Sequence, residues 1–154
     1  AGPSVQPSAD GSLVKKMIYS KFWRLVFTFT GAPAFIAGAN HLGYLNYRPS
    51  AEEVRDYVSS YSGRIGQVTK WFKGYPGGCK EIDPHLNKIN IPVHILWGDQ
   101  DAFLKADNAE QLHTRLHNSN LTIFKDCGHF FYQDKCSEFT KLLKSWVNGG
   151  YKQN

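Results

Sequence analysis

The sequence contains little cysteine. Its three cysteines, Cys79, Cys127 and Cys136, form no C-x-x-C pair. An odd number of thiols without that spacing argues against a closed disulfide framework and against a four-thiolate zinc site. Reduced thiols fit best and favour a cytoplasmic location, but the location stays unknown because a longer natural N-terminus could carry a targeting segment.

The sequence also lacks runs of like charge. Its 18 basic and 13 acidic residues leave a net charge of +5, and the basic residues are scattered among apolar and acidic positions. A solvated surface is therefore favoured, and we expect no nucleic-acid partner. We also expect no signal peptide and no membrane span within these residues, since we find neither a basic-then-apolar leader nor an apolar run of about 18 residues.

Apolar residues and aromatic rings, by contrast, are abundant. The 154 residues are 42% apolar, which is enough for one compact domain with a core. With 10 Phe, 8 Tyr and 4 Trp, either that core or a ligand cavity should be rich in rings. This composition weakly favours an apolar substrate.

The first part of the chain is expected to be helical. Ser50 and Glu53 form a capping box, S-x-x-E, that predicts the start of a helix. Around it we expect an extended segment over residues 1–11, a helix over 12–30, a glycine-punctuated apolar stretch over 31–47, and a short helix over 64–73 that the Gly and Pro of GYPGG end.

The second part changes in character. INIPVHILWG and SNLTIFKDCG are apolar, β-prone runs typical of strands buried in a parallel sheet, and each precedes an amphipathic helical pattern. Two parallel strands leave both sheet edges unpaired, so this unit is expected to be incomplete alone. Either another chain supplies strands or these residues are one piece of a larger fold.

Each expected strand ends in a loop that carries a titratable residue. Asp101 follows the first strand in WGDQD, and His129 follows the second in DCGH, 28 residues later. The carboxyl ends of parallel strands form the ligand crevice of an open sheet, so we expect these two side chains to lie side by side. An Asp that accepts from one ring N–H fixes the histidine tautomer and stabilises the imidazolium, which makes His129 a candidate base.

These motifs resemble the C-terminal end of the α/β-hydrolase superfamily, in the branch with a helical cap that includes epoxide hydrolases, haloalkane dehalogenases, carbon–carbon bond hydrolases and many esterases. The family's acid follows a strand in G-x-x-D and its histidine follows the last strand in G-H. Gly98 to Asp101 and Gly128-His129 match these patterns. The resemblance implies catalytic roles for Asp101 and His129, with Asp99 as the weaker candidate for the acid.

The resemblance also implies an α/β fold, the C-terminal portion of an α/β-hydrolase, in which a helical cap precedes the last two parallel strands and their helices. We expect residues 1–11 to be a loop leading in from the core, 12–88 to be the cap, and 89–154 to be the C-terminal part of the core. Phe130 and Phe131 are expected to wall the pocket beside His129, and Trp97 to belong to the core.

The family's nucleophile stands on a G-x-(Ser/Asp/Cys)-x-G elbow before the cap. None of the 14 glycines in this sequence forms such an elbow. We therefore expect a hydrolase that acts only with an N-terminal polypeptide carrying the nucleophile and oxyanion hole. A small apolar ester, epoxide or related compound is the expected substrate, but without the nucleophile the reaction subtype stays open.

Two other functional interpretations stay open. The lack of an elbow also fits a non-catalytic remnant, or a ligand- or protein-binding module, of the same fold. The intact Asp–His pair argues against this non-catalytic interpretation. A peripheral membrane or nucleic-acid module built on the basic, apolar helix over residues 12–30 ranks below both.

Other candidate residues have simpler interpretations. His113 and His117 stand at i, i+4, but they lack a third ligand and the glutamate of H-E-x-x-H, so we expect neither a metal nor a cofactor. Cys127 is expected to be a buried free thiol rather than a reactive one. A cap tyrosine could donate to a substrate oxygen, but packing is the safer interpretation for Tyr44, Tyr47, Tyr57, Tyr61 and Tyr75.

Overall fold

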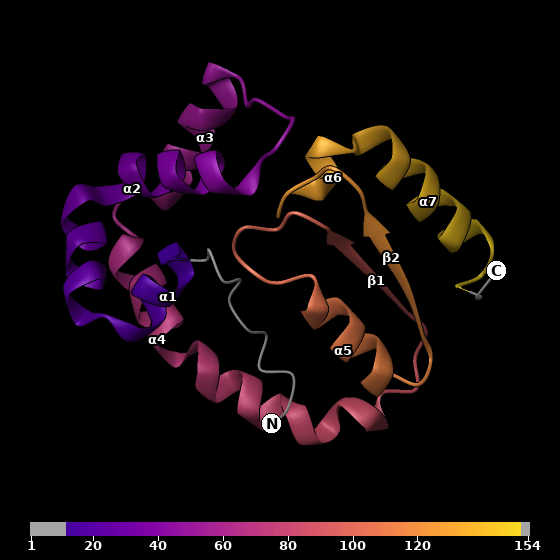
Figure 1. Ribbon diagram of the computed structural model, residues 1–154. Coiled ribbons are helices and arrows are strands. Elements are labelled where there is room, and N and C mark those ends of the chain that lie inside the picture. Colours follow the sequence, from indigo (N-terminus) through magenta and orange to yellow (C-terminus); the bar gives the residue numbers. More distant parts are fainter. Residues whose placement is uncertain (1–11, 152–154) are drawn as a thin grey trace.

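The computed structural model describes residues 12–151, so the expected loop over residues 1–11 lies outside the described residues. A group of helices comes first in the chain, and a two-stranded parallel sheet with its own helices follows (Figure 1). The first group comprises α1 (Ser12–Tyr19), α2 (Lys21–Gly43), α3 (Ala51–Tyr61), α4 (Ile65–Ile82) and the short 3-10 helix η1 (Asp83–Lys88). The second comprises β1 (Val93–Gly98), α5 (Asp107–Arg115), β2 (Ser119–Phe124), α6 (Phe131–Asp134) and α7 (Cys136–Asn148).

The expected helix over residues 12–30 is broken at Ser20. The Ser20 side chain accepts from the backbone N–H of Trp23 and begins α2. Arg24 then donates to the last carbonyls of α1, at 3.1 Å from Met17 O and 2.8 Å from Ile18 O. A serine cap and an arginine on exposed carbonyls satisfy the groups that a helix break leaves open.

The glycine-punctuated stretch over residues 31–47, which belongs to the part of the chain expected to be helical, is helical as far as Gly43, where α2 ends. Gly31 has a φ of 75°, and the helix kinks there before Pro33. Glycine tolerates this left-handed conformation, and proline is tolerated at the first turn of the new helical segment. The break is therefore local, and α2 resumes beyond it.

Helix α2 is long and apolar enough to cross a membrane, by length and composition alone. The helix has 23 residues, and its most apolar 18-residue stretch has a mean hydropathy of 1.2. Only 11% of that stretch is buried inside the protein. Our expectation of no such run is corrected, because residues 25–47 contain no charged residue and their glycines and alanines do not interrupt the apolar character.

Helix α3 confirms the expected capping box, whereas helix α4 is longer than expected. The capping box of α3 is present, with Glu53 N–H donating to Ser50 Oγ and Ser50 N–H donating to Glu53 Oε2. Helix α4 does not end at GYPGG but continues through Pro76 to Ile82. Packing against α1 and α2 outweighs the local preference of Gly and Pro to end a helix, as tertiary contacts often do.

The sheet confirms the two expected strands and their parallel pairing. Val93 pairs with Ser119 and Gly98 with Phe124 at the two ends of the register. Because side chains alternate along a strand, Ile95 faces the core cluster beneath α5 while His94 faces Trp146 of α7. Figure 1 shows α5 and α7 on opposite faces of the sheet.

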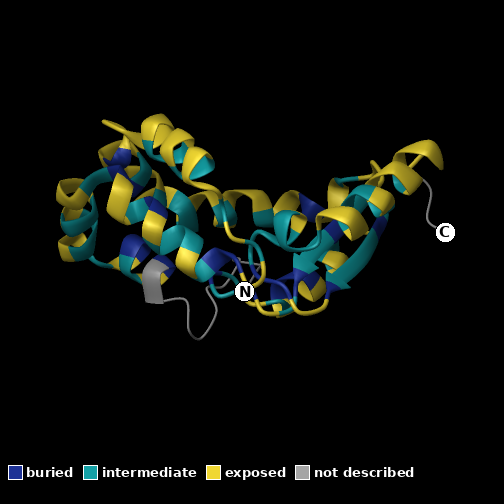
Figure 2. Cartoon of the chain, turned by 90° about the horizontal axis from the view of Figure 1, so that it is seen from above, coloured by how far each residue is buried: buried dark blue, intermediate teal, exposed yellow. Residues whose placement is uncertain are grey.

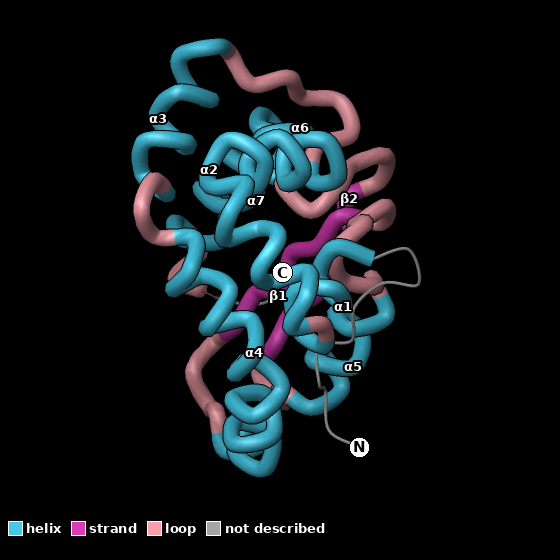
Figure 3. The backbone as a smooth tube through the Cα atoms, turned by 90° about the vertical axis from the view of Figure 1, so that its left-hand side faces the viewer, coloured by secondary structure: helices cyan, strands magenta, loops and turns pink. Residues whose placement is uncertain are grey.

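Within the described residues, no third strand pairs with β1 or β2. Figure 3 shows the two strands side by side among helices, and Figure 2 shows that exposed and half-buried residues predominate over most elements. An α/β fold with so small a sheet matches the expectation of an incomplete unit. The helices and the carboxyl ends of the strands meet at the candidate site.

Candidate active site

Asp101 is held rigidly in the loop after β1. Its side chain is 3% exposed, and its Oδ1 accepts from the backbone N–H groups of Phe103 at 2.8 Å and Leu104 at 2.9 Å. Its Oδ2 lies 2.7 Å from Nδ1 of His129. Two backbone donors thus fix the carboxylate so that its second oxygen points at the imidazole.

His129 follows β2 and is partly open to its surroundings, with a side chain that is 34% exposed. Edge-on contacts with Phe103 and Phe130, at ring-centroid distances of 5.0 and 5.3 Å, fix the plane of its ring. Because Nδ1 faces the Asp101 carboxylate, Nδ1 carries a proton in the neutral ring and donates it to that carboxylate. Nε2 is then the basic nitrogen, and no partner for it is found among residues 12–151.

The structure thus brings the two predicted residues into contact, while the weaker candidate, Asp99, lies apart from the histidine ring. Asp99 Oδ2 is 3.7 Å from Lys125 Nζ, and Asp99 Oδ1 accepts from the backbone N–H of Cys127 at 3.5 Å. The catalytic roles of Asp101 and His129 stay predictions.

Three glycines pack closely around the histidine loop. A Cβ at Gly98 would overlap the carbonyl oxygen of Gly128, a Cβ at Gly128 would overlap that of Gly43, and a Cβ at Gly43 would overlap the ring of Phe130. The end of β1, the histidine loop and the end of α2 therefore approach one another at backbone distance, which only glycine permits.

Asp134 joins two of these parts, the histidine loop and the segment that follows α2. Its carboxylate accepts from the backbone N–H groups of Leu45 at 2.9 Å, Asn46 at 2.9 Å, Tyr47 at 2.7 Å and Gly128 at 2.9 Å. Burial alone would raise the pKa of Asp134, but these four donors outweigh it, and the net pKa is lowered. The ionised carboxylate ties the segment after α2 to the residue that precedes His129.

Sequence reasoning missed Asp134, because its four partners are backbone groups that no side-chain pattern marks. It also missed Phe103 as a ring contact of His129. Both residues stand within six positions of a predicted site residue, but only the folded chain shows what they touch.

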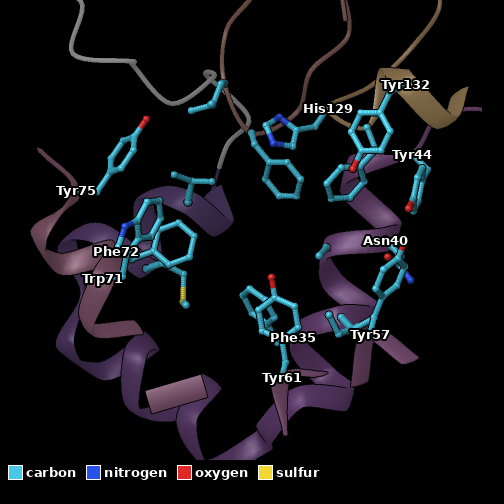
Figure 4. A pocket seen from close by; sticks show the side chains of 17 residues that line it. Phe35, Asn40, Tyr44, Tyr57, Tyr61, Trp71, Phe72, Tyr75, His129 and Tyr132 are labelled. Atoms are coloured by element: carbon cyan, nitrogen blue, oxygen red, sulfur yellow. The ribbon is translucent and has the colours of Figure 1, made fainter. Parts of the chain in front are cut away.

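A cavity of about 400 Å³ opens beside His129. Figure 4 shows His129 at one end, Trp71, Phe72 and Tyr75 on one wall, and Tyr44, Asn40 and Tyr57 on the opposite wall. Burial, as the largest cause, raises the pKa of both Tyr44 and Tyr75. Both hydroxyls are neutral around pH 7, and that of Tyr44 donates to Gln133 Oε1 at 2.5 Å.

Of the two phenylalanines expected in the pocket wall, Phe130 lines this cavity and Phe131 does not. The Phe131 ring stacks on Phe124 of β2 at 5.3 Å and meets Phe139 of α7 at 5.9 Å. Helix α6 begins at Phe131, so consecutive side chains diverge, and the second one turns toward the sheet.

The remaining predicted residues have structural partners. His113 Nδ1 lies 2.8 Å from Ser119 Oγ, and residues 12–151 contain no cluster of metal-ligating side chains. Cys127 is fully buried with its thiol 3.4 Å from Phe124 O, and burial, followed by the nearby Asp134 and Asp99, raises its pKa to about 11. Trp97 packs against the core cluster beneath α5.

Solved structures share this arrangement of helices, strands and loops. The chain aligns over 96% of its length with 52% of a serine hydrolase from Cycloclasticus zankles, at a TM-score of 0.65 and 19% identity. It aligns over 93% of its length with 49% of an aryl esterase, described as putative, from Burkholderia cenocepacia, at a TM-score of 0.64 and 20% identity. The chain has the fold of part of an α/β-hydrolase, consistent with the C-terminal portion, which confirms the predicted fold class.

Sequence relatives agree with this fold. The chain is 28% identical over 83 residues to a 2-hydroxy-6-oxononadienedioate/2-hydroxy-6-oxononatrienedioate hydrolase of Klebsiella pneumoniae, covering 54% of this chain and 29% of the relative. It is 32% identical over 66 residues to a monoacylglycerol lipase of Bos taurus, covering 43% of this chain and 20% of the relative. No family model matches the chain. Carbon–carbon hydrolases and esterases of the α/β-hydrolase superfamily are thus its homologues, and the chain spans less than a third of these two curated relatives.

Proposed function

We propose that these residues supply the general base, its orienting acid and the substrate-covering cap of an α/β-hydrolase. The observation that carries the proposal is the 2.7 Å contact between His129 Nδ1 and Asp101 Oδ2 at the end of a ring-lined cavity. Relatedness to α/β-hydrolases supports the reaction class.

In the proposed mechanism, His129 Nε2 takes a proton from a nucleophile or from the hydrolytic water. The imidazolium that forms keeps both ring protons and is stabilised by the Asp101 carboxylate. Asp101 acts as a positioning residue, since both its oxygens are occupied by Phe103 N–H, Leu104 N–H and the imidazole. The nucleophile and the oxyanion hole are proposed to stand on an N-terminal portion of the same fold, because the sequence contains no elbow.

In the proposed domain organisation, residues 12–88 form the cap over a substrate bound beside His129 and residues 89–154 belong to the core. Rings from α2, α3 and α4 line much of the cavity, and Tyr57 and Tyr61 of α3 face it from the side opposite Tyr75 of α4 (Figure 4). Residues 1–11 are proposed to connect the cap to the core.

We propose a small, uncharged ester or related compound with an apolar or aromatic group as substrate. The described lining of the cavity contains no lysine or arginine that could neutralise a carboxylate. The lining that residues 12–151 supply therefore favours an uncharged part of the ligand. Aromatic rings with a few neutral polar groups are typical of sites for apolar ligands.

The test is hydrolysis of p-nitrophenyl esters by the purified protein, together with any polypeptide that copurifies with it. His129→Ala should lower kcat by about 10³-fold, since general base catalysis contributes on this scale. His117→Ala is the matched control, because His117 is exposed, and it should leave the rate unchanged.

Intact-mass analysis of the same preparation tests the proposed N-terminal portion. We expect a nucleophile-bearing segment, labelled by a fluorophosphonate where the nucleophile is Ser. An active preparation containing a 17.4 kDa species alone would overturn the need for a companion portion. Activity that survives His129→Ala would overturn the role of the histidine, and an inactive intact protein would favour the non-catalytic binding module.

A further inference from the structure

The positive charge of the chain is concentrated in one segment. Residues 11–51 contain Lys15, Lys16, Lys21, Arg24 and Arg48 and no acidic residue, and the rest of the chain has 13 basic and 13 acidic residues. This one segment therefore accounts for the entire net charge of +5. It comprises α1, α2 and the loop that follows them.

The same segment exposes large apolar side chains. Phe22, Leu25 and Phe29 of α2 are 66%, 47% and 85% exposed, and Tyr19 at the end of α1 is 73% exposed. The spacing of three and then four residues along α2 puts Phe22, Leu25 and Phe29 on one face of the helix. We call these four residues, together with the exposed Lys15 and Lys21, the aromatic-basic surface.

The α2 part of the aromatic-basic surface lies away from the sheet, whereas α1, which carries Lys15, packs through Val14 and Ile18 against Phe103 in the loop after β1. Figure 1 shows the first half of α2 at the left edge of the molecule, with β1 and β2 on the other side, and Figure 2 shows the same edge coloured as exposed and half-buried. Strands that complete the sheet would pair with the edges of β1 or β2, not with the first half of α2.

We propose that the aromatic-basic surface docks on a membrane that contains anionic lipids. Aromatic and aliphatic side chains enter the boundary between headgroups and acyl chains, while lysines near them contact anionic headgroups. The complete absence of acidic residues between Gly11 and Ala51 removes the repulsion that would otherwise oppose an anionic surface.

The geometry of α2 favours lying on the membrane over crossing it. The helix kinks at Gly31, and its second half lines the cavity through Phe35 and Ile36. Its first half packs against α4, where Thr28 Oγ1 lies 3.5 Å from Thr69 Oγ1. A helix whose inner side is committed to protein contacts can bury only its outer face in lipid.

The test is cosedimentation of the purified protein with vesicles of phosphatidylcholine alone or of phosphatidylcholine with 30% phosphatidylglycerol. We expect binding to the anionic vesicles and at least about tenfold weaker binding to the neutral ones. The double variant Phe22→Ser, Phe29→Ser and the double variant Lys15→Glu, Lys21→Glu should each lose about tenfold or more in affinity for anionic vesicles.

The matched control is the double variant Leu143→Ser, Val147→Ser, which removes exposed apolar side chains from α7 and should bind vesicles like the unaltered protein. Circular dichroism and the urea midpoint should be unchanged in all three variants, because the substituted side chains are exposed. Equal binding of the Phe22/Phe29 variant, or no preference for anionic vesicles, would overturn the proposal. Loss of a copurifying protein from that variant, with vesicle binding unaltered, would assign the surface to a protein partner instead.

Discussion

At the scale of single residues, two aspartates define the surroundings of His129. Asp101 contacts the imidazole directly, and Asp134 holds the backbone on which the imidazole stands. The Asp101 carboxylate contacts the imidazole and two backbone N–H groups of its own loop. The Asp134 carboxylate accepts from four backbone N–H groups, three in the segment after α2 and one at Gly128. The first contact orients the imidazole, and the second holds the backbone of the loop that carries it.

Replacing Asp134 by Asn should destabilise the protein by about 2 kcal/mol, because hydrogen bonds to a charged acceptor are worth more than those to a neutral one. The amide of Asn also presents an N–H group where the carboxylate accepts. The measurement is urea unfolding of the purified protein. Asp56→Asn is the control, since Asp56 is exposed on α3, and it should change the free energy of unfolding little.

Asp134→Asn should also change how the free energy of unfolding depends on pH at acid pH. The pKa of Asp134 is lowered in the folded protein, so its ionised form contributes stability above the unfolded value of 3.8. That contribution is lost as the pH falls through the lower folded pKa. Unfolding of Asp134→Asn should therefore depend less on pH below about 4, and an unaltered dependence there would contradict the importance of this carboxylate.

At the scale of elements, the close approach of Gly98, Gly128 and Gly43 joins the sheet to the helices. Gly98→Ala would bring a Cβ into the backbone of Cys127 and Gly128, neither of which can move as a flexible side chain does. We expect a destabilisation of about 2 kcal/mol and, because the loop shifts, a loss of any activity that depends on His129.

The control for Gly98→Ala is a glycine whose substitution meets nothing. A Cβ at Gly78, in α4, has no atom within 4 Å. Gly78→Ala should therefore raise the free energy of unfolding by about 0.5 to 1 kcal/mol, the helix preference of Ala over Gly. Opposite signs for the two variants in thermal unfolding would support the glycine packing, and equal effects would contradict it.

Elements with strong local signals could be predicted from sequence. Short sequence patterns mark these elements: the S-x-x-E capping box at Ser50, the apolar run that becomes β1, and the glycines that precede Asp101 and His129. The continuation of α4 through Pro76 could not be predicted, since packing on α1 and α2 decides it. The contacts of Asp134 could not either, because they join segments more than 80 residues apart.

At the scale of the whole molecule, the cavity depends on both parts of the chain. The helices contribute most of its rings, and the loops after β1 and β2 contribute Phe103, His129 and Phe130. The two parts are held together by Asp134, by the glycine packing and by the Phe130 N–H, which donates to Gly43 O at 3.0 Å. Loss of this junction should remove the cavity even where every helix stays folded.

The pH dependence of global stability should reveal a second histidine, His94 of β1. Its Nε2 lies 2.9 Å from Thr122 Oγ1 and its ring meets Trp146 edge-on at 5.7 Å, while its Nδ1 is buried without a partner among the described residues. Neither neighbour can compensate a positive charge, so burial lowers the pKa of His94.

A lowered histidine pKa means that the unfolded chain takes up a proton before the folded one does. The free energy of unfolding should therefore fall as the pH drops below the unfolded value of 6.5, until the folded pKa is reached. Urea unfolding between about pH 7 and about pH 5 measures this loss. His94→Leu should flatten the dependence, whereas His117→Leu, at an exposed histidine, should leave it intact. A slope that is the same in all three proteins would mean that His94 is protonated as easily in the folded sheet as in water.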